Sequence, residues 1–259
     1  MPMSSFVNPP GLPDAAPRPP DTGASTPAAP AALRERAFAD ALAHDLRAPL
    51  RSIENFAALL ERRSGEVLDE ASRDYLARIR AAATRMGTLL ASLSELSAAQ
   101  RAEPQVAPVD ISLLAEWALA ELADTHPQRQ VQAVVQPGLV MHGDERLLRQ
   151  LLQQLLRNAW AFTAGVADAR IEVSGAAEAA GQRLAVRDNG VGFDPRYAHK
   201  LFEPFQRLHV AEQGAGHGLG LAIAQAVATR HGGRVRGESA PGTGTVFTFE
   251  WPVPPAGDA

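Results

Sequence analysis

Two successive stripes of apolar residues constrain this chain more than any other feature of its sequence. In each stripe the apolar residues recur every three or four positions, as they do along one face of an amphipathic helix. The first stripe comprises Phe38, Leu42, Leu46, Leu50, Ile53, Phe56 and Leu60, and the second comprises Leu76, Ile79, Ala83, Met86, Leu90, Leu93 and Leu96. The pair Ser64-Gly65 breaks the pattern between them. The stripes predict two antiparallel helices, the first over residues 31–63.

A hairpin of two helices leaves part of each apolar stripe in contact with water, because two helices alone cannot enclose a core. Packing two such hairpins together forms a four-helix bundle, which buries the stripes of both copies. We therefore expect the chain to form a homodimer through this hairpin.

The regions on either side of the hairpin differ sharply in composition. Residues 1–30 contain nine of the twenty prolines and only three charged residues, so we predict a disordered tail that is rich in proline and alanine. Pro104 and Pro108 mark a second boundary. We accordingly divide the chain into a tail (1–30), a helical domain (31–103) and a third domain (104–259).

In the third domain, patterns typical of helices alternate with patterns typical of strands, which predicts an α+β fold with helices on one face of a mixed sheet. The expected helices lie near 111–123, 144–162 and 218–231, and the expected strands lie near 131–135, 170–174, 183–188, 234–239 and 244–251. In the last strand Phe247, Phe249 and Trp251 share one face, as the two-residue period of a strand requires.

Charge and composition exclude several classes of function. The net charge of −4 argues against a nucleic-acid partner, and the absence of cysteine excludes thiol chemistry and cysteine-ligated metals. No apolar run approaches the ~18 residues of a membrane-spanning helix, and no signal peptide is recognisable. We expect a cytoplasmic protein without membrane insertion.

A candidate nucleophile lies in the first helix, in the motif HDLRAPL at residues 44–50. His44 falls beside the apolar stripe, so its ring can face solvent, and Asp45 can accept the ring proton while a nitrogen attacks. The alternative is an ordinary solvated histidine with an acidic neighbour, and this motif alone does not decide between the two.

Two motifs of the third domain carry polar groups suited to a nucleotide. LLQQLLRNAWAFT, residues 151–163, contains Asn158, whose amide oxygen can ligate magnesium. DNGVGF, residues 188–193, follows an expected strand. There Asp188 can accept a hydrogen bond from an exocyclic amino group, and Gly190 and Gly192 let the backbone approach a flat ring.

A glycine-rich motif, GAGHGLGLAIA at residues 214–224, runs into an apolar helix. Backbone N–H groups at such a helix start form an anion site suited to polyphosphate. LFEPFQRLH at residues 201–209 precedes this motif, and residues 206–217 are poor in large apolar groups. We interpret 206–217 as a mobile lid.

Taken in their order along the chain, the five motifs resemble the histidine, asparagine, first glycine, phenylalanine and second glycine boxes of sensor histidine kinases. PGTGT at 241–245 is similar to the closing glycine turn of that family. HDLRAPLRSI, LFEPFQRLH and RHGGRV are especially similar to the transmitter modules of bacteriophytochrome-type and PAS-linked kinases. The resemblance covers roughly residues 31–255.

The resemblance implies a fold and a cofactor for each domain. Residues 31–103 would be the dimerisation and histidine phosphotransfer domain. Residues 104–259 would be a catalytic domain of the Bergerat type, an α/β sandwich shared with gyrase and Hsp90 that binds ATP and Mg²⁺. His44 would be the phosphoacceptor and Asp45 the general base, with Asn158 as the magnesium ligand. The ATP-binding residues implied are Asn158, Asp188, Gly190, Gly192, Arg207, Gly216, His217, Gly218, Leu219 and Gly220.

Three positions in the ATP-binding motifs depart from the family pattern. Gln154 stands where a second asparagine is common, but its amide preserves the chemistry. Ala161 stands where a phosphate-contacting lysine is common, and Arg207 is the residue that we expect to compensate. His217 replaces a small threonine or serine between the glycines.

The resemblance implies an ATP-dependent protein-histidine kinase that passes phosphate to the receiver domain of a response regulator. Two alternatives remain: a histidine phosphotransfer adaptor with a vestigial ATP domain, and a non-kinase ATPase of the same fold. Because no sensor domain is recognisable, we expect either a kinase without one or control by a separate sensor protein.

Overall fold

The computed structural model describes residues 28–178, 181–206 and 216–253, with the backbone alone for residues 28–42 and 44. Residues 1–27 of the predicted tail, and residues 207–215 of the predicted lid, lie outside this part of the chain. Arg207 belongs to the second of these segments.

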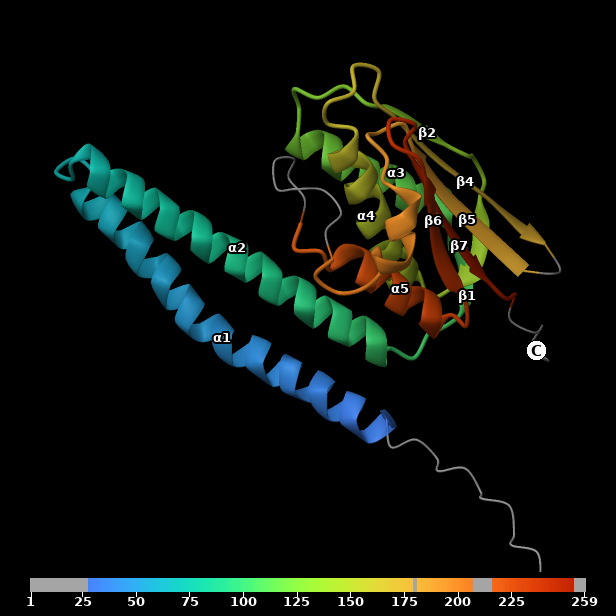
Figure 1. Cartoon of the computed structure of the whole chain (residues 1–259), viewed down its shortest axis with the longest axis horizontal. Coiled ribbons are helices and arrows are strands. Elements are labelled where there is room, and N and C mark those ends of the chain that lie inside the picture. Colours follow the sequence, from blue (N-terminus) through green and yellow to red (C-terminus); the bar gives the residue numbers. More distant parts are fainter. Residues whose placement is uncertain (1–27, 179–180, 207–215, 254–259) are drawn as a thin grey trace, which may run out of the picture.

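Two long helices form the predicted antiparallel hairpin (Figure 1). Helix α1 (Ala28–Ser64) ends at the predicted break, and helix α2 (Glu70–Arg101) follows a short turn. The side chain of Asp69 caps α2 by accepting a hydrogen bond from the backbone N–H of Ser72 at 2.8 Å. In the described part of the chain, no helix has both the length and the apolar character needed to cross a membrane.

The hairpin has only a small core of its own. Ala43, Leu50, Ala83 and Leu90 are buried together between the two helices, and Leu93 packs against them. Six other large residues of the stripes are exposed: Leu46, Ile53, Phe56, Leu60, Ile79 and Met86. Leu76 is buried, and Leu96 is buried in the core of the third domain. This distribution is what the predicted lack of a closed core requires.

The third domain contains the predicted mixed sheet, with strand order β2-β4-β5-β7-β6. Its strands are β2 (Gln132–Val135), β4 (Arg170–Glu178), β5 (Gly181–Asp188), β6 (Arg234–Ser239) and β7 (Thr245–Trp251). β2 pairs with β4 in parallel and all other neighbours are antiparallel. A second sheet, of the two strands β1 (Ala107–Asp110) and β3 (Val140–Gly143), was not predicted from the sequence. Neither was the short 3₁₀ helix η1 (Pro195–Lys200).

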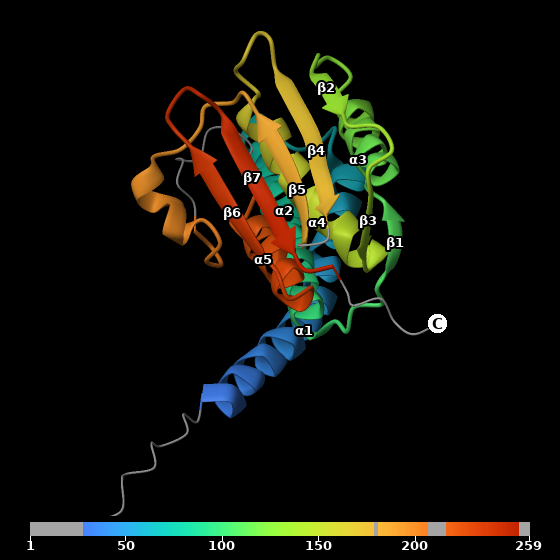
Figure 2. The ribbon, with the colours of Figure 1, turned by 90° about the vertical axis from the view of Figure 1, so that its right-hand side faces the viewer.

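Three helices cover one face of the five-stranded sheet, as predicted: α3 (Ile111–Thr125), α4 (Glu145–Phe162) and α5 (Gly220–Arg230) (Figure 2). α4 is central to the core because six of its leucines are fully buried: Leu147, Leu148, Leu151, Leu152, Leu155 and Leu156. Side chains of Asp110 and Asp144 cap α3 and α4.

The C-terminal part of α2 packs against the third domain. Leu96 and Ala99 belong to the domain's main core, and α2 contacts α5. The Arg230 side chain donates a hydrogen bond to the carbonyl of Ala102, just beyond α2. Figure 1 shows α1 on the far side of α2 from this domain.

Candidate active site

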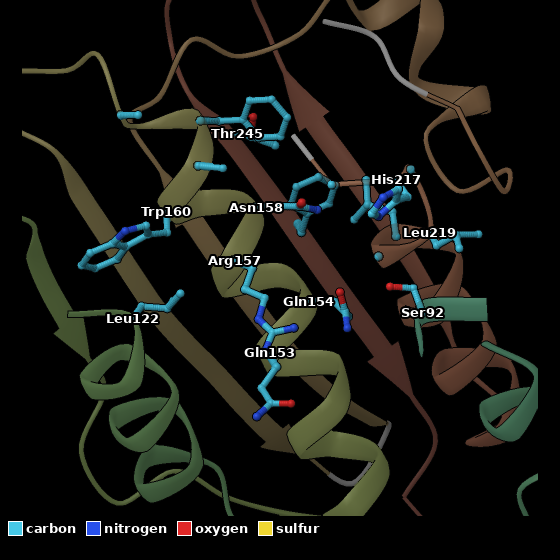
Figure 3. A pocket seen from close by; sticks show the side chains of 18 of the residues that line it. Ser92, Leu122, Gln153, Gln154, Arg157, Asn158, Trp160, His217, Leu219 and Thr245 are labelled. Carbon is cyan, nitrogen blue, oxygen red and sulfur yellow. The ribbon is translucent and has the colours of Figure 1, made fainter. Parts of the chain in front are cut away.

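A pocket of about 930 Å³ lies between α4 and α5 and extends to α3 and α2 (Figure 3). Of the predicted site residues, Asn158, Gly192, Gly216, His217, Gly218, Leu219 and Gly220 line it. α2 contributes Thr88 and Ser92 to its wall. The fold therefore brings together motif residues as far apart in the sequence as Asn158 and Gly220.

The N-terminus of α5 borders this pocket. Its N-cap residue, Leu219, makes no side-chain capping hydrogen bond, whereas aspartates cap α2, α3 and α4. The first backbone N–H groups of a helix lack partners within the helix and attract anions. Gly218 has a φ of 72°, and a Cβ there would meet the Gln206 carbonyl oxygen at 2.7 Å, so this position requires glycine.

The opposite wall is a polar face of α4. Gln154 and Asn158 are four residues apart, so they share one helix face, and both are half-buried. A Cβ at Gly220 would lie 2.8 Å from the Gln154 side-chain oxygen. The amide of Gln154 therefore contacts the start of α5 directly, and glycine there permits the close approach.

Asp188 lies at the end of β5, behind the pocket surface. It is only 4% exposed, and it pairs in the sheet with Thr245, which does line the pocket. Its carboxylate accepts a hydrogen bond from the Gly190 N–H at 2.8 Å. Burial raises the pKa of Asp188 to about 6, although backbone hydrogen bonds from Gly190 and Thr245 act in the opposite direction.

The two glycines of the DNGVGF motif differ in their position relative to the pocket. Gly192 lines the pocket, whereas Gly190 is buried behind it, where a Cβ would meet the Phe162 carbonyl oxygen at 2.5 Å. Gly190 thus packs the motif against the end of α4 and donates to Asp188, rather than forming the pocket surface itself.

The predicted nucleophile lies apart from the pocket. His44 and Asp45 belong to α1, and none of the α1 side chains that the structure describes (residue 43 and residues 45–64) lines the pocket. The Arg47 side chain donates a hydrogen bond to the Ser94 hydroxyl, which places this stretch of α1 beside the part of α2 near the third domain. Asp45 is exposed, and the side chain of His44 is outside the described set.

The pocket residues fit a magnesium ion that arrives with phosphate. Within the described residues, no three histidine, cysteine, aspartate or glutamate side chains gather as a metal site. Asn158 and Gln154 instead offer single amide oxygens at the pocket wall. Magnesium accepts such sparse protein ligation when substrate phosphates and water complete its coordination.

Three of the pocket-lining residues that were not predicted from the sequence are notable for their chemistry. Arg157 immediately precedes Asn158, and Trp160 lines the pocket on the α3 side. The Arg129 guanidinium lies 4.8 Å from the Trp160 ring centroid and donates to the Thr163 hydroxyl at 2.6 Å. Only Arg157 carried a usable sequence signal, because it lies three residues after Gln154 and next to Asn158.

Two family models match the chain. The His Kinase A (phospho-acceptor) domain matches residues 34–102. The histidine kinase-, DNA gyrase B- and HSP90-like ATPase domain matches residues 143–255. The first match contains α2 and most of α1, including His44, and the second contains α4, α5 and the five residues from Gly216 to Gly220.

Sequence similarity to individual histidine kinases and phytochrome-like proteins is consistent with these two family matches. The chain is 32% identical over 216 residues to the phytochrome-like protein Cph1 of Synechocystis sp., covering 83% of this chain and 29% of Cph1. It is 31% identical over 224 residues to the sensor-like histidine kinase SenX3 of Mycobacterium tuberculosis, covering 84% of this chain and 54% of SenX3. The chain thus spans less than a third of one curated relative and about half of the other.

A solved structure supports the same assignment. Full-length ShkA in complex with AMPPNP superposes with a TM-score of 0.65 and 27% identity, covering 84% of this chain and 46% of that chain. The order of the two domains, the converging motifs and these matches agree. The chain is a histidine kinase transmitter module, in which a phospho-acceptor domain precedes a Bergerat-type ATPase domain.

Proposed function

We propose that the chain is an ATP-dependent protein-histidine kinase that binds MgATP in the pocket between α4 and α5 and phosphorylates His44. The observation that carries this proposal is the convergence at one pocket of the uncapped α5 N-terminus and the amides of Gln154 and Asn158, with Asp188 directly behind it. An anion site, sparse oxygen ligands and a buried carboxylate suit a nucleotide triphosphate with its metal.

The proposed binding mode assigns one part of the nucleotide to each wall. Asp188 accepts a hydrogen bond from the exocyclic amino group of adenine, and its burial makes this hydrogen bond stronger than it would be in water. Backbone N–H groups from Gly216 to Gly220 hold the phosphates. Asn158 ligates the Mg²⁺ that the phosphates carry, which neutralises part of their charge.

The transfer step forms a bond between a ring nitrogen of His44 and the γ-phosphorus. The bond from the γ-phosphorus to the bridging oxygen breaks, ADP leaves with that electron pair, and Asp45 accepts the ring proton. Because α1 lies on the far side of α2 from the ATPase domain (Figure 1), we propose that the ATPase domain moves along the hairpin for this step or serves His44 of a second copy.

We further propose that the phosphoryl group passes from His44 to an aspartate in the receiver domain of a response regulator, and that the module acts as a homodimer in the cytoplasm. The exposed apolar residues of the hairpin support the dimer. The use of ATP as the phosphoryl donor supports the cytoplasmic location.

A direct test incubates the purified full chain with ATP labelled at the γ-phosphate. A histidine kinase acquires label that acid removes and base does not, and it passes the label to a cognate receiver domain. An adaptor with a vestigial ATP domain takes no label from ATP but accepts it from a phosphorylated receiver domain. The second result would contradict the proposal.

A further inference from the structure

We infer that Arg157 is the cation that contacts the terminal phosphates of the nucleotide, in place of the lysine that is absent at position 161. This inference rests on the proposed function and adds a specific residue to the phosphate site.

The first support is the position of Arg157 on α4. Gln154, Arg157 and Asn158 are spaced i, i+3 and i+4, so their side chains leave neighbouring points of one helix face. Gln154 contacts Gly220 at the start of α5, which is a site suited to anions. The backbone of Arg157 therefore lies about one helical turn of α4 from that site. Figure 3 shows the three side chains on α4, with Leu219 and Ser92 beyond them.

The second support is that Arg129, the other arginine in the described pocket lining, already has hydrogen-bond partners within the protein. The Arg129 guanidinium donates to the carbonyl of Trp160 and to the hydroxyl of Thr163, and it stacks over the Trp160 ring. Arg157, in contrast, is exposed and forms no hydrogen bond or ion pair with another described residue. Its guanidinium therefore retains all of its donors for a ligand.

The third support is the charge that the site must neutralise. Adjacent phosphates carry several negative charges, and the α5 N-terminus offers only about half of one positive charge. Ala161, one turn after Arg157, supplies none. A guanidinium presents paired N–H donors that match two phosphate oxygens, and Arg157 can reach along the helix face that Ala161 leaves free.

The inference predicts a loss that depends on the number of phosphates. We would measure the affinity of the full chain for MgATP, MgADP and AMP by calorimetry, at low and moderate salt. Arg157→Gln should weaken MgATP binding by about ten-fold, because one charge-assisted contact is lost. The same variant should leave AMP binding unchanged, and its MgATP affinity should depend less on salt. Arg157→Lys should retain most of the affinity.

Arg149→Gln is the matched control, since Arg149 lies two turns earlier on α4 and pairs with Glu145 outside the site; it should change nothing. A lysine added by Ala161→Lys should restore MgATP binding to the Arg157→Gln variant. Equal losses for MgATP and AMP, or no loss at all, would overturn the role of Arg157 and leave the proposed function standing. A wild-type chain that binds none of the three nucleotides would overturn both.

Discussion

The hairpin and the ATPase domain solve the problem of burying apolar residues in opposite ways. In α4, six leucines are fully buried beneath the sheet. In the hairpin, Phe56 is 71% exposed, and Ile53 and Ile79 are about half exposed. The domain encloses its own core, whereas the hairpin leaves several of its large apolar residues exposed.

This difference implies a division of labour. A domain with a closed core can hold a pocket in fixed geometry, which phosphate and metal positioning require. A hairpin with exposed apolar residues offers a surface for the proposed dimer. α2 links the two regions because its last turns belong to the core of the ATPase domain. Mutations in the two regions should therefore have different kinds of effect.

The largest effect should come from the closed core. Leu155 is 0% exposed in α4, and Leu155→Ala should lower the free energy of unfolding of the ATPase domain by about 2–5 kcal/mol through lost burial and a cavity. Urea unfolding followed by tryptophan fluorescence measures this loss. Leu113→Ala, at a 40% exposed leucine of α3, should cost much less. Equal losses would mean that the core is not closed as described.

The next effect should appear in assembly and leave nucleotide binding intact. Phe56→Ser should weaken the dimer by about 1.5–3 kcal/mol per chain, the value of burying one large apolar side chain. Sedimentation velocity over a concentration series gives the dissociation constant, and AMP binding serves as the control for an intact ATPase domain. An unchanged dissociation constant would remove this face of the hairpin from the dimer interface.

A smaller effect should appear at the buried carboxylate. Asp188→Asn should weaken ATP binding by about ten-fold, because a charge-assisted hydrogen bond is lost. In the wild type, ATP affinity should also fall as the pH drops below about 6, where Asp188 takes up a proton. Calorimetry across this pH range should show the fall for the wild type and not for the variant. A variant with wild-type affinity would exclude Asp188 from the site.

The same residue predicts how stability changes with pH. The pKa of Asp188 is raised in the folded state, from 3.8 to about 6, so the folded state holds this proton more tightly than the unfolded state. The unliganded domain should therefore lose stability from this group as the pH rises from about 4 to about 6. Comparing the thermal unfolding of wild type and Asp188→Asn isolates the contribution, and parallel profiles would contradict it.

The smallest effect should come from ion pairs on the hairpin surface. Glu61 of α1 pairs with Arg80 of α2, and both side chains are about half exposed. Glu61→Gln should therefore cost only about 0.2–1 kcal/mol, because solvent screens such pairs. Unfolding of the isolated variant measures this, and a larger loss would mean that ion pairs, rather than apolar packing, hold the two helices together.

Strong periodicity made the large elements predictable from the sequence. The hairpin helices, α4 and the last strand pair were predicted because their apolar residues recur with a regular period. β1 and β3 were missed because each has only four residues, which is too few for a periodic pattern to stand out in the sequence. Such short strands form because tertiary packing brings them together.

The residues of the candidate site also differ in whether local sequence patterns could predict them. Asn158 and the residues from Gly216 to Gly220 were predicted from motifs that are local in the sequence, and the fold places them at one pocket. Ser92 could not be predicted, because it lines the pocket only through the packing of α2 against α5. The separation of His44 from the pocket likewise depends on how the two domains pack, which no local motif reports.

The central claim is that the ATPase domain delivers phosphate to one histidine of the hairpin. Its most direct test compares wild type and His44→Gln after incubation with γ-labelled ATP, with ATP affinity measured on both. We predict equal ATP affinity and acid-labile label on the wild type alone, because glutamine lacks the nucleophilic ring nitrogen. Acid-labile label that persists on His44→Gln would contradict the account.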